Sequence, residues 1–361
     1  LVDEAHHLPD RARDMLSATL DSHILRIFRR DIGKQYGRKH GFYPALGRLI
    51  RSIESMPGRP DNHAAFCSDV APDTLGSCLE ACMDAAMALL STSSPMASAI
   101  AVIARDLFSA QATLARFGAG YTLLCQPLGP QELCMTLFCL DPAPHLRAYT
   151  KRLHGSVFFS ATLTPLCAYR TLLGGDTEDA LLSIPSPFPR ENLLVLRRSI
   201  STRYQDREST AEIVARTIGV CAQQHPGNYL ACFPSYQYVT LVQDCMQRLF
   251  PDLPLRVQQS GMQDAQRADF LAAFAPRTDD TLLGMIVLGG VFGEGIDLPG
   301  DRLCGVMVVG VALPQISFAC ETLRAYYESA LGDGFAYAYM YPGMNKVLQA
   351  VGRVIRTETD R

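Results

Sequence analysis

The sequence lacks the features that define several protein classes. Its 33 basic and 36 acidic residues leave a formal net charge of −3. This balance excludes a polycationic coat for nucleic acid, although it is compatible with a local basic track. Only four of the 33 basic residues are lysines. Arginine suits phosphate binding, but a GC-rich genome produces the same bias, so this ratio alone decides nothing.

Cysteines and long apolar runs are also too few to define a class. Twelve cysteines in 361 residues are well below the density of a disulfide scaffold. The sequence has no C-x-x-C pair and no histidine pair that would complete a zinc site. We therefore expect the cysteines to be core thiols. The longest uncharged run, residues 303–320, is interrupted by glycine, proline and serine. We therefore expect a strand and a loop there, and no membrane span.

The length predicts two domains or three. Leu1 and Val2, followed directly by two acids, are typical of the end of a buried strand. A domain does not start at the end of a strand, so we expect the chain to be a piece of a longer protein. Helical periodicity dominates residues 9–120.

A different pattern follows this helical region. Short apolar runs predict strands at residues 134–140, 156–159, 193–196, 228–233, 282–288 and 306–309. Helical patterns lie between several of these runs, for example at 211–224 and 236–249. Alternating strands and helices predict an α/β domain with a parallel sheet, in which ligands bind at the carboxyl ends of the strands.

Four stretches carry side chains or glycines suited to nucleotide chemistry. Residues 3–6 (D-E-A-H) follow a strand end, where an aspartate can hold magnesium and a neighbouring glutamate can activate water. Residues 160–162 (S-A-T) place two hydroxyls after a predicted strand. Residues 289–297 (G-G-V-F-G-E-G-I-D) allow close approach of the backbone to a phosphate. Residues 349–356 (Q-A-V-G-R-V-I-R) put two arginines on one helix face, as arginine fingers require.

Together these stretches resemble the motifs of superfamily 2 helicases, specifically of the XPD/DinG-like family. In family order, residues 3–6 resemble motif II, 160–162 motif III, 233–236 motif IV, 289–297 motif V and 349–356 motif VI. The resemblance implies α/β RecA-like domains with parallel sheets and an inserted all-α, arch-like domain, the first RecA-like domain being incomplete. The implied boundaries are 1–20 and 126–180 for RecA-like domain 1, 21–125 for the insertion and 181–361 for RecA-like domain 2.

The resemblance also assigns catalytic roles. Asp3 would hold Mg²⁺ and Glu4 would be the general base. The other implied catalytic residues are His6 and Gln349, which would couple hydrolysis to movement, and the arginine fingers Arg353 and Arg356. Glu294, Gly295 and Asp297 would help to close the cleft around ATP.

Nucleic-acid contacts are assigned in the same way. Ser160 and Thr162 would link the nucleotide cleft to DNA. The residues that would contact the DNA strand are Ser235, Tyr236, Gly289 and Gly290. Simple packing is an equally good interpretation for Tyr236. Separately, six basic residues lie within residues 26–39, and Arg30 and Lys34 share one helix face. They are candidate phosphate contacts, although a solvated helix face explains them as well.

The resemblance therefore implies an ATP-dependent DNA helicase in repair or replication, acting on single-stranded or forked DNA, mostly 5′ to 3′. We expect a cytoplasmic, bacterial nucleoid-associated protein with no membrane partner; the sequence names no protein partner. The chain contains no P-loop, G-x-x-x-x-G-K-[S/T], so the piece alone is expected to be inactive. The ligands of the family's iron–sulfur cluster would also lie outside this chain. A non-enzymatic nucleic-acid-binding module and an RNA helicase remain alternatives.

Overall fold

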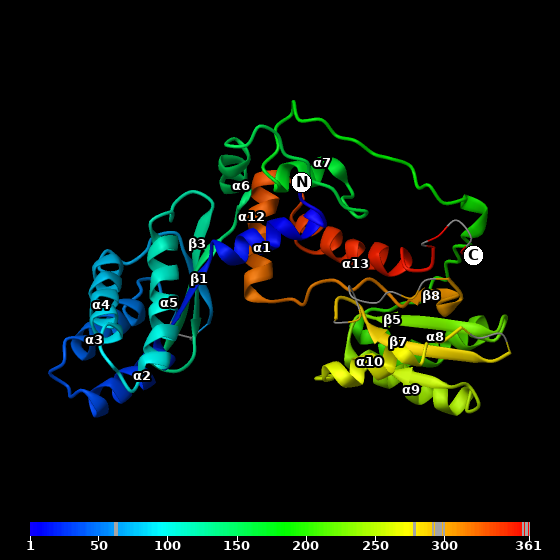
Figure 1. The fold of residues 1–361 in the computed structure, drawn as a ribbon, viewed down its shortest axis with the longest axis horizontal. Helices are drawn as coiled ribbons and strands as arrows, with labels where there is room; N and C mark the ends of the chain where they lie inside the picture. Colours follow the sequence, from blue (N-terminus) through cyan, green and yellow to red (C-terminus); the bar gives the residue numbers. More distant parts are fainter. Residues whose placement is uncertain are drawn as a thin grey trace. The chain divides into compact units, whose positions relative to one another are not determined.

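The computed structural model describes residues 1–60, 64–276, 279–290, 292, 298, 300–355, 357 and 360. The chain forms two compact units (Figure 1). The first comprises Leu1–Ser160 with Leu166–Asp179, and the second comprises Ala161–Pro165 with Ala180–Arg361.

The first unit combines helices with an antiparallel sheet. Its helices are α1 (Leu8–Met15), α2 (Ser22–Gln35), α3 (Phe42–Glu54), α4 (Leu75–Leu90), α5 (Ala97–Leu114), α6 (Ala143–Thr150) and α7 (Leu166–Leu172), preceded by a 3₁₀ turn at Ala5–His7. Its strands are β1 (Ala18–Asp21), β2 (Phe66–Ser68), β3 (Tyr121–Pro127) and β4 (Leu133–Cys139). Their order in the sheet is β1-β4-β3-β2, with every neighbouring pair antiparallel.

Alternating burial explains how this sheet packs. Along β4, Leu133, Met135 and Leu137 are fully buried, whereas the residues between them are partly exposed. Successive side chains of a strand point to opposite faces, so these three face the same side. There they join one hydrophobic core with the apolar stripes of α2 to α5, such as Phe42 and Leu46 of α3.

The prediction of an all-α insertion is therefore wrong. Between residues 21 and 125 the chain contributes β2 and most of β3 to the sheet, and β1 lies at its start. The run at 134–140 is a strand, as predicted, but it pairs with antiparallel neighbours instead of joining a parallel sheet. The short β1 and β2 escaped the sequence pattern because three or four residues carry too little periodicity.

The second unit is built on a parallel sheet. Its strands are β5 (Gly227–Phe233), β6 (Leu255–Val257), β7 (Thr281–Val287) and β8 (Gly305–Val308), in the order β6-β7-β5-β8. Its helices are α8 (Arg207–Ala222), α9 (Tyr236–Leu249), α10 (Asp264–Ala272), α12 (Phe318–Leu331) and α13 (Tyr341–Val351), with a π-helical turn at Ala336–Met340 before α13.

Both faces of the central strands are covered in this unit. In β5, Ala231 and Phe233 pack with residues of α8 and α9, whereas Leu230 and Cys232 pack in a second core with Phe270 of α10. A parallel strand buried on both sides is continuously apolar. The runs at 228–233, 282–288 and 306–309 show this pattern, and their prediction as strands is confirmed.

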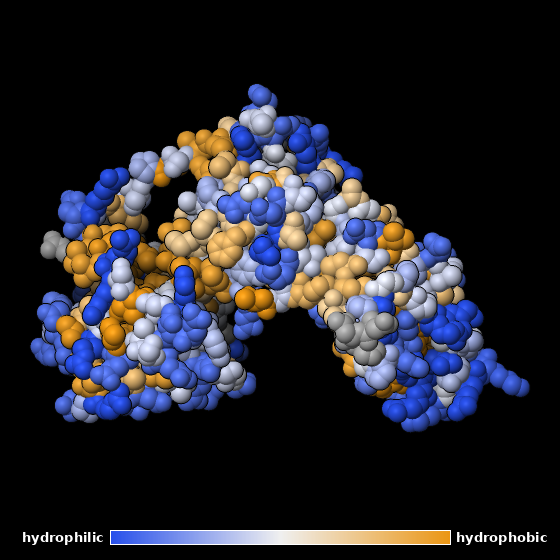
Figure 2. Space-filling view, turned by 180° about the vertical axis from the view of Figure 1, so that it is seen from behind, coloured by the Kyte–Doolittle hydropathy of each residue, from blue (hydrophilic) through white to orange (hydrophobic). Residues whose placement is uncertain are grey.

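Two other predicted strands differ from the structure. Within 156–159 the described pairing is a single parallel bridge between Phe158 and Val2. Residues 193–196 form no strand, and Leu194, Val195 and Leu196 are 73–80% exposed. Figure 2 shows that exposed apolar patches occur on the visible face of the molecule. An apolar run alone does not supply the neighbouring strand that a sheet requires.

Within the described ranges, no helix is long and apolar enough to cross a membrane.

Candidate active site and nucleic-acid interface

In the first unit, backbone hydrogen bonds bring the D-E-A-H and S-A-T stretches together. The amide of Val2 donates to the carbonyl of Val157 at 2.9 Å, and the amide of Phe159 donates back to the carbonyl of Val2 at 3.0 Å. The amide of Ala5 then donates to the carbonyl of Phe159 at 3.1 Å. Because the paired segments run parallel, both lead their polar residues to the same edge.

At this edge, Ser160 bridges two residues of the D-E-A-H stretch. Its Oγ donates to Oε2 of Glu4 at 3.0 Å and lies 2.8 Å from Nδ1 of His6. With the serine proton directed at the carboxylate, a proton on Nδ1 of His6 would complete the second bond, and the same nitrogen lies 3.3 Å from Oε2 of Glu4. The His6 side chain is 3% exposed and that of Glu4 is 62% exposed. One end of this chain is therefore buried and the other is open to solvent.

Glu4 has an unusual backbone. It adopts φ 48° and ψ 41°, and among the described residues it is the one non-glycine with positive φ. This left-handed conformation costs an ordinary side chain about 1–2 kcal/mol. Strain of this kind is concentrated at functional sites. Asp3, directly before it, is exposed and accepts a hydrogen bond from the amide of Glu4 at 2.7 Å.

In the second unit, the sequence candidates lie where strands of the parallel sheet end. Ser235 follows β5 and caps α9 by accepting from the amide of Tyr238 at 3.3 Å. Tyr236 begins α9 and remains 37% exposed. Gly289 and Gly290 follow β7. The structure thus gathers the motif IV and motif V candidates at one edge of the sheet.

Position 289 requires glycine because of its backbone conformation. Its φ of 72° is one that glycine adopts without strain. A Cβ there would also meet the side chain of Lys346, with 3.0 Å to its Cε. The backbone of the turn therefore approaches α13 closely.

The described motif VI residues lie on and directly after α13. Gln349 is in the helix, and its carbonyl accepts from Nε of Arg353 at 3.3 Å. Arg353 is 6% exposed and donates from Nη1 to the carbonyl of Phe292 at 2.8 Å. Through this hydrogen bond the guanidinium of Arg353 connects motif VI with the segment after β7. The guanidinium also lies near Cys232: burial raises the pKa of that thiol to about 12, and the positive charge of Arg353 opposes the rise.

Several sequence candidates are placed differently or not at all. Thr162 is buried, at 4% exposed, and belongs to the second unit. Glu294, Gly295, Asp297 and Arg356 lie outside the described residues. Within the part of the chain that the structure describes, no group of three or more metal-ligating side chains occurs.

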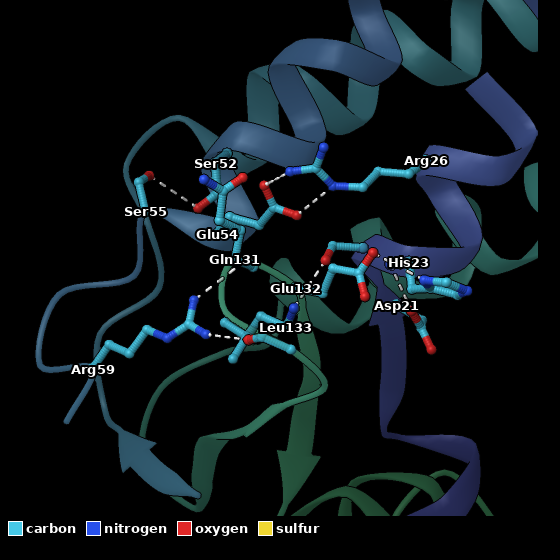
Figure 3. Close-up of polar contacts among 12 residues, drawn as sticks. Asp21, His23, Arg26, Ser52, Glu54, Ser55, Arg59, Gln131, Glu132 and Leu133 are labelled. Atoms are coloured by element: carbon cyan, nitrogen blue, oxygen red, sulfur yellow. Dashed lines mark hydrogen bonds and ion pairs between the residues drawn. The ribbon is translucent and has the colours of Figure 1, made fainter. Parts of the chain in front are cut away.

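The basic stretch divides into paired and solvent-facing residues. Arg26 forms a two-point ion pair with Glu54 at the end of α3, which Figure 3 shows, and Arg29 lies 4.0 Å from the centre of the Tyr43 ring. By contrast, the side chains of Arg30 and Lys34 are 65% and 70% exposed. Both lie within 4 Å of Asp31, at 3.9 and 3.7 Å. These two remain candidates for phosphate contact.

Sequence reasoning missed two residues at the edge of the parallel sheet. Gln258 follows β6, and its Nε2 donates to the hydroxyl of Tyr236 at 2.9 Å. Arg207 begins α8 and lies 3.4 Å from Oγ of Ser235. Gln258 follows the three-residue strand β6, whose exposed Arg256 interrupts the apolar pattern, so the sequence carried no signal for it.

Comparison with known proteins finds similarity to helicases. The helicase C-terminal domain family matches residues 218–361, which include β5 to β8 and the motif IV to motif VI stretches. The chain is 25% identical over its whole length to the ATP-dependent DNA helicase YoaA of Escherichia coli, of which it covers 58%. Over 68% of its length it is 23% identical to the probable ATP-dependent helicase MJ0942 of Methanocaldococcus jannaschii, covering 37% of that protein.

A shorter match of higher identity is to the ATP-dependent DNA helicase DinG of Photobacterium profundum. It is 36% identical over 72 residues, which are 20% of this chain and 10% of that protein. The chain thus spans about a third to somewhat more than half of the curated relatives that match most of it.

Solved structures show the same fold. A structure named XPD_APO matches 99% of the chain with a TM-score of 0.55 at 16% identity, and the chain covers 70% of it. Xpd4 of S. tokodaii matches with a TM-score of 0.55 at 12% identity, with 99% and 68% of the two chains covered. The α/β fold of the second unit is therefore that of a RecA-like helicase domain. The ordered motifs, the matched helicase C-terminal domain and the relatives named as DNA helicases make the chain similar to XPD/DinG-like helicases of superfamily 2.

Proposed function

We propose that the chain carries the motif II to motif VI portion of an ATP-dependent DNA helicase. This helicase couples ATP hydrolysis to movement along single-stranded DNA, 5′ to 3′, and to opening of forked duplexes in repair or replication. The observation that carries the proposal is the bridge of Ser160 between Glu4 and His6, which joins two motifs 154 positions apart. The matched relatives named as DNA helicases favour DNA over RNA.

The donor set at the start of the chain fits magnesium. Asp3 and Glu4 are adjacent, exposed carboxylates, and Mg²⁺ prefers oxygen ligands and keeps several waters. Asp3 would hold the ion, which when bound with ATP neutralises phosphate charge. Glu4 would accept a proton from the attacking water at Oε1, because Oε2 already accepts the Ser160 proton.

Ser160 and His6 would orient this base. The buried imidazole donates to Ser160, which in turn donates to Glu4, so the carboxylate is held from one side. A displacement of the S-A-T segment would therefore change the position of the Glu4 carboxylate. Such a connection is what coupling between hydrolysis and movement on DNA requires.

The second unit would supply the DNA and transition-state contacts. Tyr236 has exposed surface for stacking on a base, and the glycine turn after β7 lets backbone amides approach a phosphate. Arg353 and Arg356 would be the arginine fingers, with Glu294, Gly295 and Asp297 near the nucleotide. Gln349 would connect these contacts through α13.

The decisive experiment replaces Glu4 by Gln in the full-length protein. Glutamine retains the size of the side chain but does not take up the proton, so we expect ATP binding to persist and turnover stimulated by single-stranded DNA to be lost. Asp14→Asn, which alters an exposed carboxylate of α1, is the matched control. Undiminished turnover in Glu4→Gln would refute the assignment of the base. Parallel unwinding assays on DNA and RNA forks separate a DNA helicase from an RNA helicase.

The 361-residue chain by itself should behave differently. It has no P-loop, so most contacts to the phosphates of ATP are missing and we expect it to hydrolyse no ATP. Measurable ATPase activity of the purified chain contradicts this expectation. A full-length protein that also lacks a P-loop and hydrolyses nothing would be a non-enzymatic binding module.

A further inference from the structure

Gln258 is a buried amide with both ends of its side chain specified. It follows β6 and is 4% exposed. Its Oε1 accepts from the amide of Val287 at 2.8 Å, and its Nε2 donates to the hydroxyl of Tyr236 at 2.9 Å. An amide that accepts at one end and donates at the other has a single orientation that satisfies both partners.

The same residue also extends the sheet. Its own amide donates to the carbonyl of Met285 at 2.9 Å, which continues the pairing of β6 with β7 by one step. One step further along β7, the amide of Val287 donates to Oε1 of the Gln258 side chain instead of to a backbone carbonyl of the β6 segment. The position of this side chain is therefore set by the end of β7.

The glycine turn packs directly on this amide. A Cβ at Gly290 would lie 3.3 Å from Nε2 of Gln258, which is closer than ordinary van der Waals contact. Replacement of Gly290 by a larger residue would press on the atom that holds Tyr236. Gln258 thus touches both the motif IV tyrosine and the motif V turn.

We propose that Gln258 is a positioning residue that fixes the orientation of Tyr236 for stacking on a base of single-stranded DNA and links it to the Gly289–Gly290 turn. The proposal rests on the proposed function, in which Tyr236 contacts DNA. A ring that is oriented before binding loses less freedom when a base stacks on it. Its hydroxyl is bound to Gln258 while more than a third of the residue stays exposed.

The test uses the full-length protein with a fluorescein-labelled oligothymidylate and the ATPase reaction that single-stranded DNA stimulates. Gln258→Met keeps a side chain of similar length but removes both hydrogen bonds. We expect about 5- to 10-fold weaker oligonucleotide binding and an equal rise in KM for DNA, with kcat at saturating DNA unchanged. Tyr236→Phe, which removes only the hydroxyl, should give a similar loss, and the double variant should be no worse than either single one.

Two further variants complete the design. Gln258→Glu retains an acceptor for both the Val287 amide and the Tyr236 hydroxyl, so binding should return to within about twofold of the unmodified protein. Gln259→Met, at the exposed neighbouring position, is the control and should bind normally. If Gln258→Met does not fold, Tyr236→Phe and Gln258→Glu still carry the test.

The outcomes separate the two proposals. Unchanged binding in Tyr236→Ala would remove Tyr236 from the DNA interface and would contradict that part of the proposed function. Weaker binding in Tyr236→Ala together with normal binding in Gln258→Met or Tyr236→Phe would overturn the positioning role and leave the DNA contact intact. Additive losses in the double variant would also overturn it, because the two side chains would then act independently.

Discussion

Nδ1 of His6 lies 2.8 Å from Oγ of Ser160, and the same oxygen lies 3.0 Å from Oε2 of Glu4. Nδ1 of His6 also lies 3.3 Å from Oε2 of Glu4, so the three side chains are in mutual contact. The hydroxyl of Ser160 is the member of this group that comes from the S-A-T stretch, and its removal leaves His6 and Glu4 facing each other directly.

Ser160→Ala tests this connection. A hydrogen bond to a charged group contributes about 1.5–3 kcal/mol, so loss of the bond to Glu4 should lower the DNA-stimulated ATPase rate by about 10- to 100-fold. Affinity for ATP should change little, because Ser160 is not assigned to the nucleotide. Stopped-flow phosphate release measures the rate, and Ser156→Ala, an exposed serine four positions earlier, is the control. An unaltered rate would make the bridge structural only.

A second prediction concerns the basic stretch of α2. Charge reversal at Arg30 and Lys34 together should weaken single-strand binding and reduce the slope of log affinity against log salt by about 1 for each phosphate that is no longer neutralised. The matched control is Arg105→Glu on α5, which is 75% exposed and also next to an aspartate. Fluorescence anisotropy at several salt concentrations supplies both values. An unchanged slope would mean that these residues only solvate the helix.

The pair of His23 and Glu132 should titrate above the ordinary histidine range (Figure 3). The hydrogen bond and charge of Glu132 raise the pKa of His23 above its usual value of 6.5. The protonated form is therefore favoured in the folded state, so the stabilisation is fully present below pH 6.5 and disappears as the pH rises through the raised value. NMR titration of His23 measures the shift. Glu132→Gln should reverse it and Glu80→Gln, on α4, should not.

Gly284 in β7 should not tolerate a methyl group. A Cβ there would lie 2.5 Å from the Phe274 ring and 2.7 Å from the side chain of Leu230. We expect Gly284→Ala to lower the free energy of unfolding by about 1–3 kcal/mol. Urea denaturation measures this change, with Gly118→Ala as the control because nothing lies within 4 Å of that position. Equal stability of the two variants would contradict the packing of this strand.

The central strands β5 and β7 were predictable from sequence because they are buried on both faces, whereas the short edge strand β6, with Arg256 exposed, was not predicted. Residues 228–233 are apolar almost without interruption, and the helices at 211–224 and 236–249 agree with α8 and α9 within a few residues. The first unit was harder to predict. Thr19 and Ser68 make the two short strands look polar, and their pairing depends on residues more than 50 positions away.

Some residues of the candidate site were predictable from the sequence and others were not. The rule that ligands meet the carboxyl ends of strands led to Ser160 as well as Glu4, and the two side chains are hydrogen-bonded. Gln258 was missed because its significance lies in a contact with Tyr236, 22 positions earlier. No local pattern distinguishes a glutamine that holds another side chain from one that faces solvent. Likewise, only the fold pairs Arg26 with Glu54 and leaves Arg30 and Lys34 exposed.

The pairing of β1 with β4 has a consequence for the order of folding. Ala18 lies opposite Leu137, so the segment between them enters and leaves the antiparallel sheet side by side. That segment has its own hydrophobic core and can become ordered while Val2 and Phe158 are still apart. Once it has formed, roughly 40 flexible residues instead of roughly 150 separate the two, which lowers the entropy lost when they meet. We therefore expect the segment from β1 to β4 to become ordered first and the two motifs to meet last.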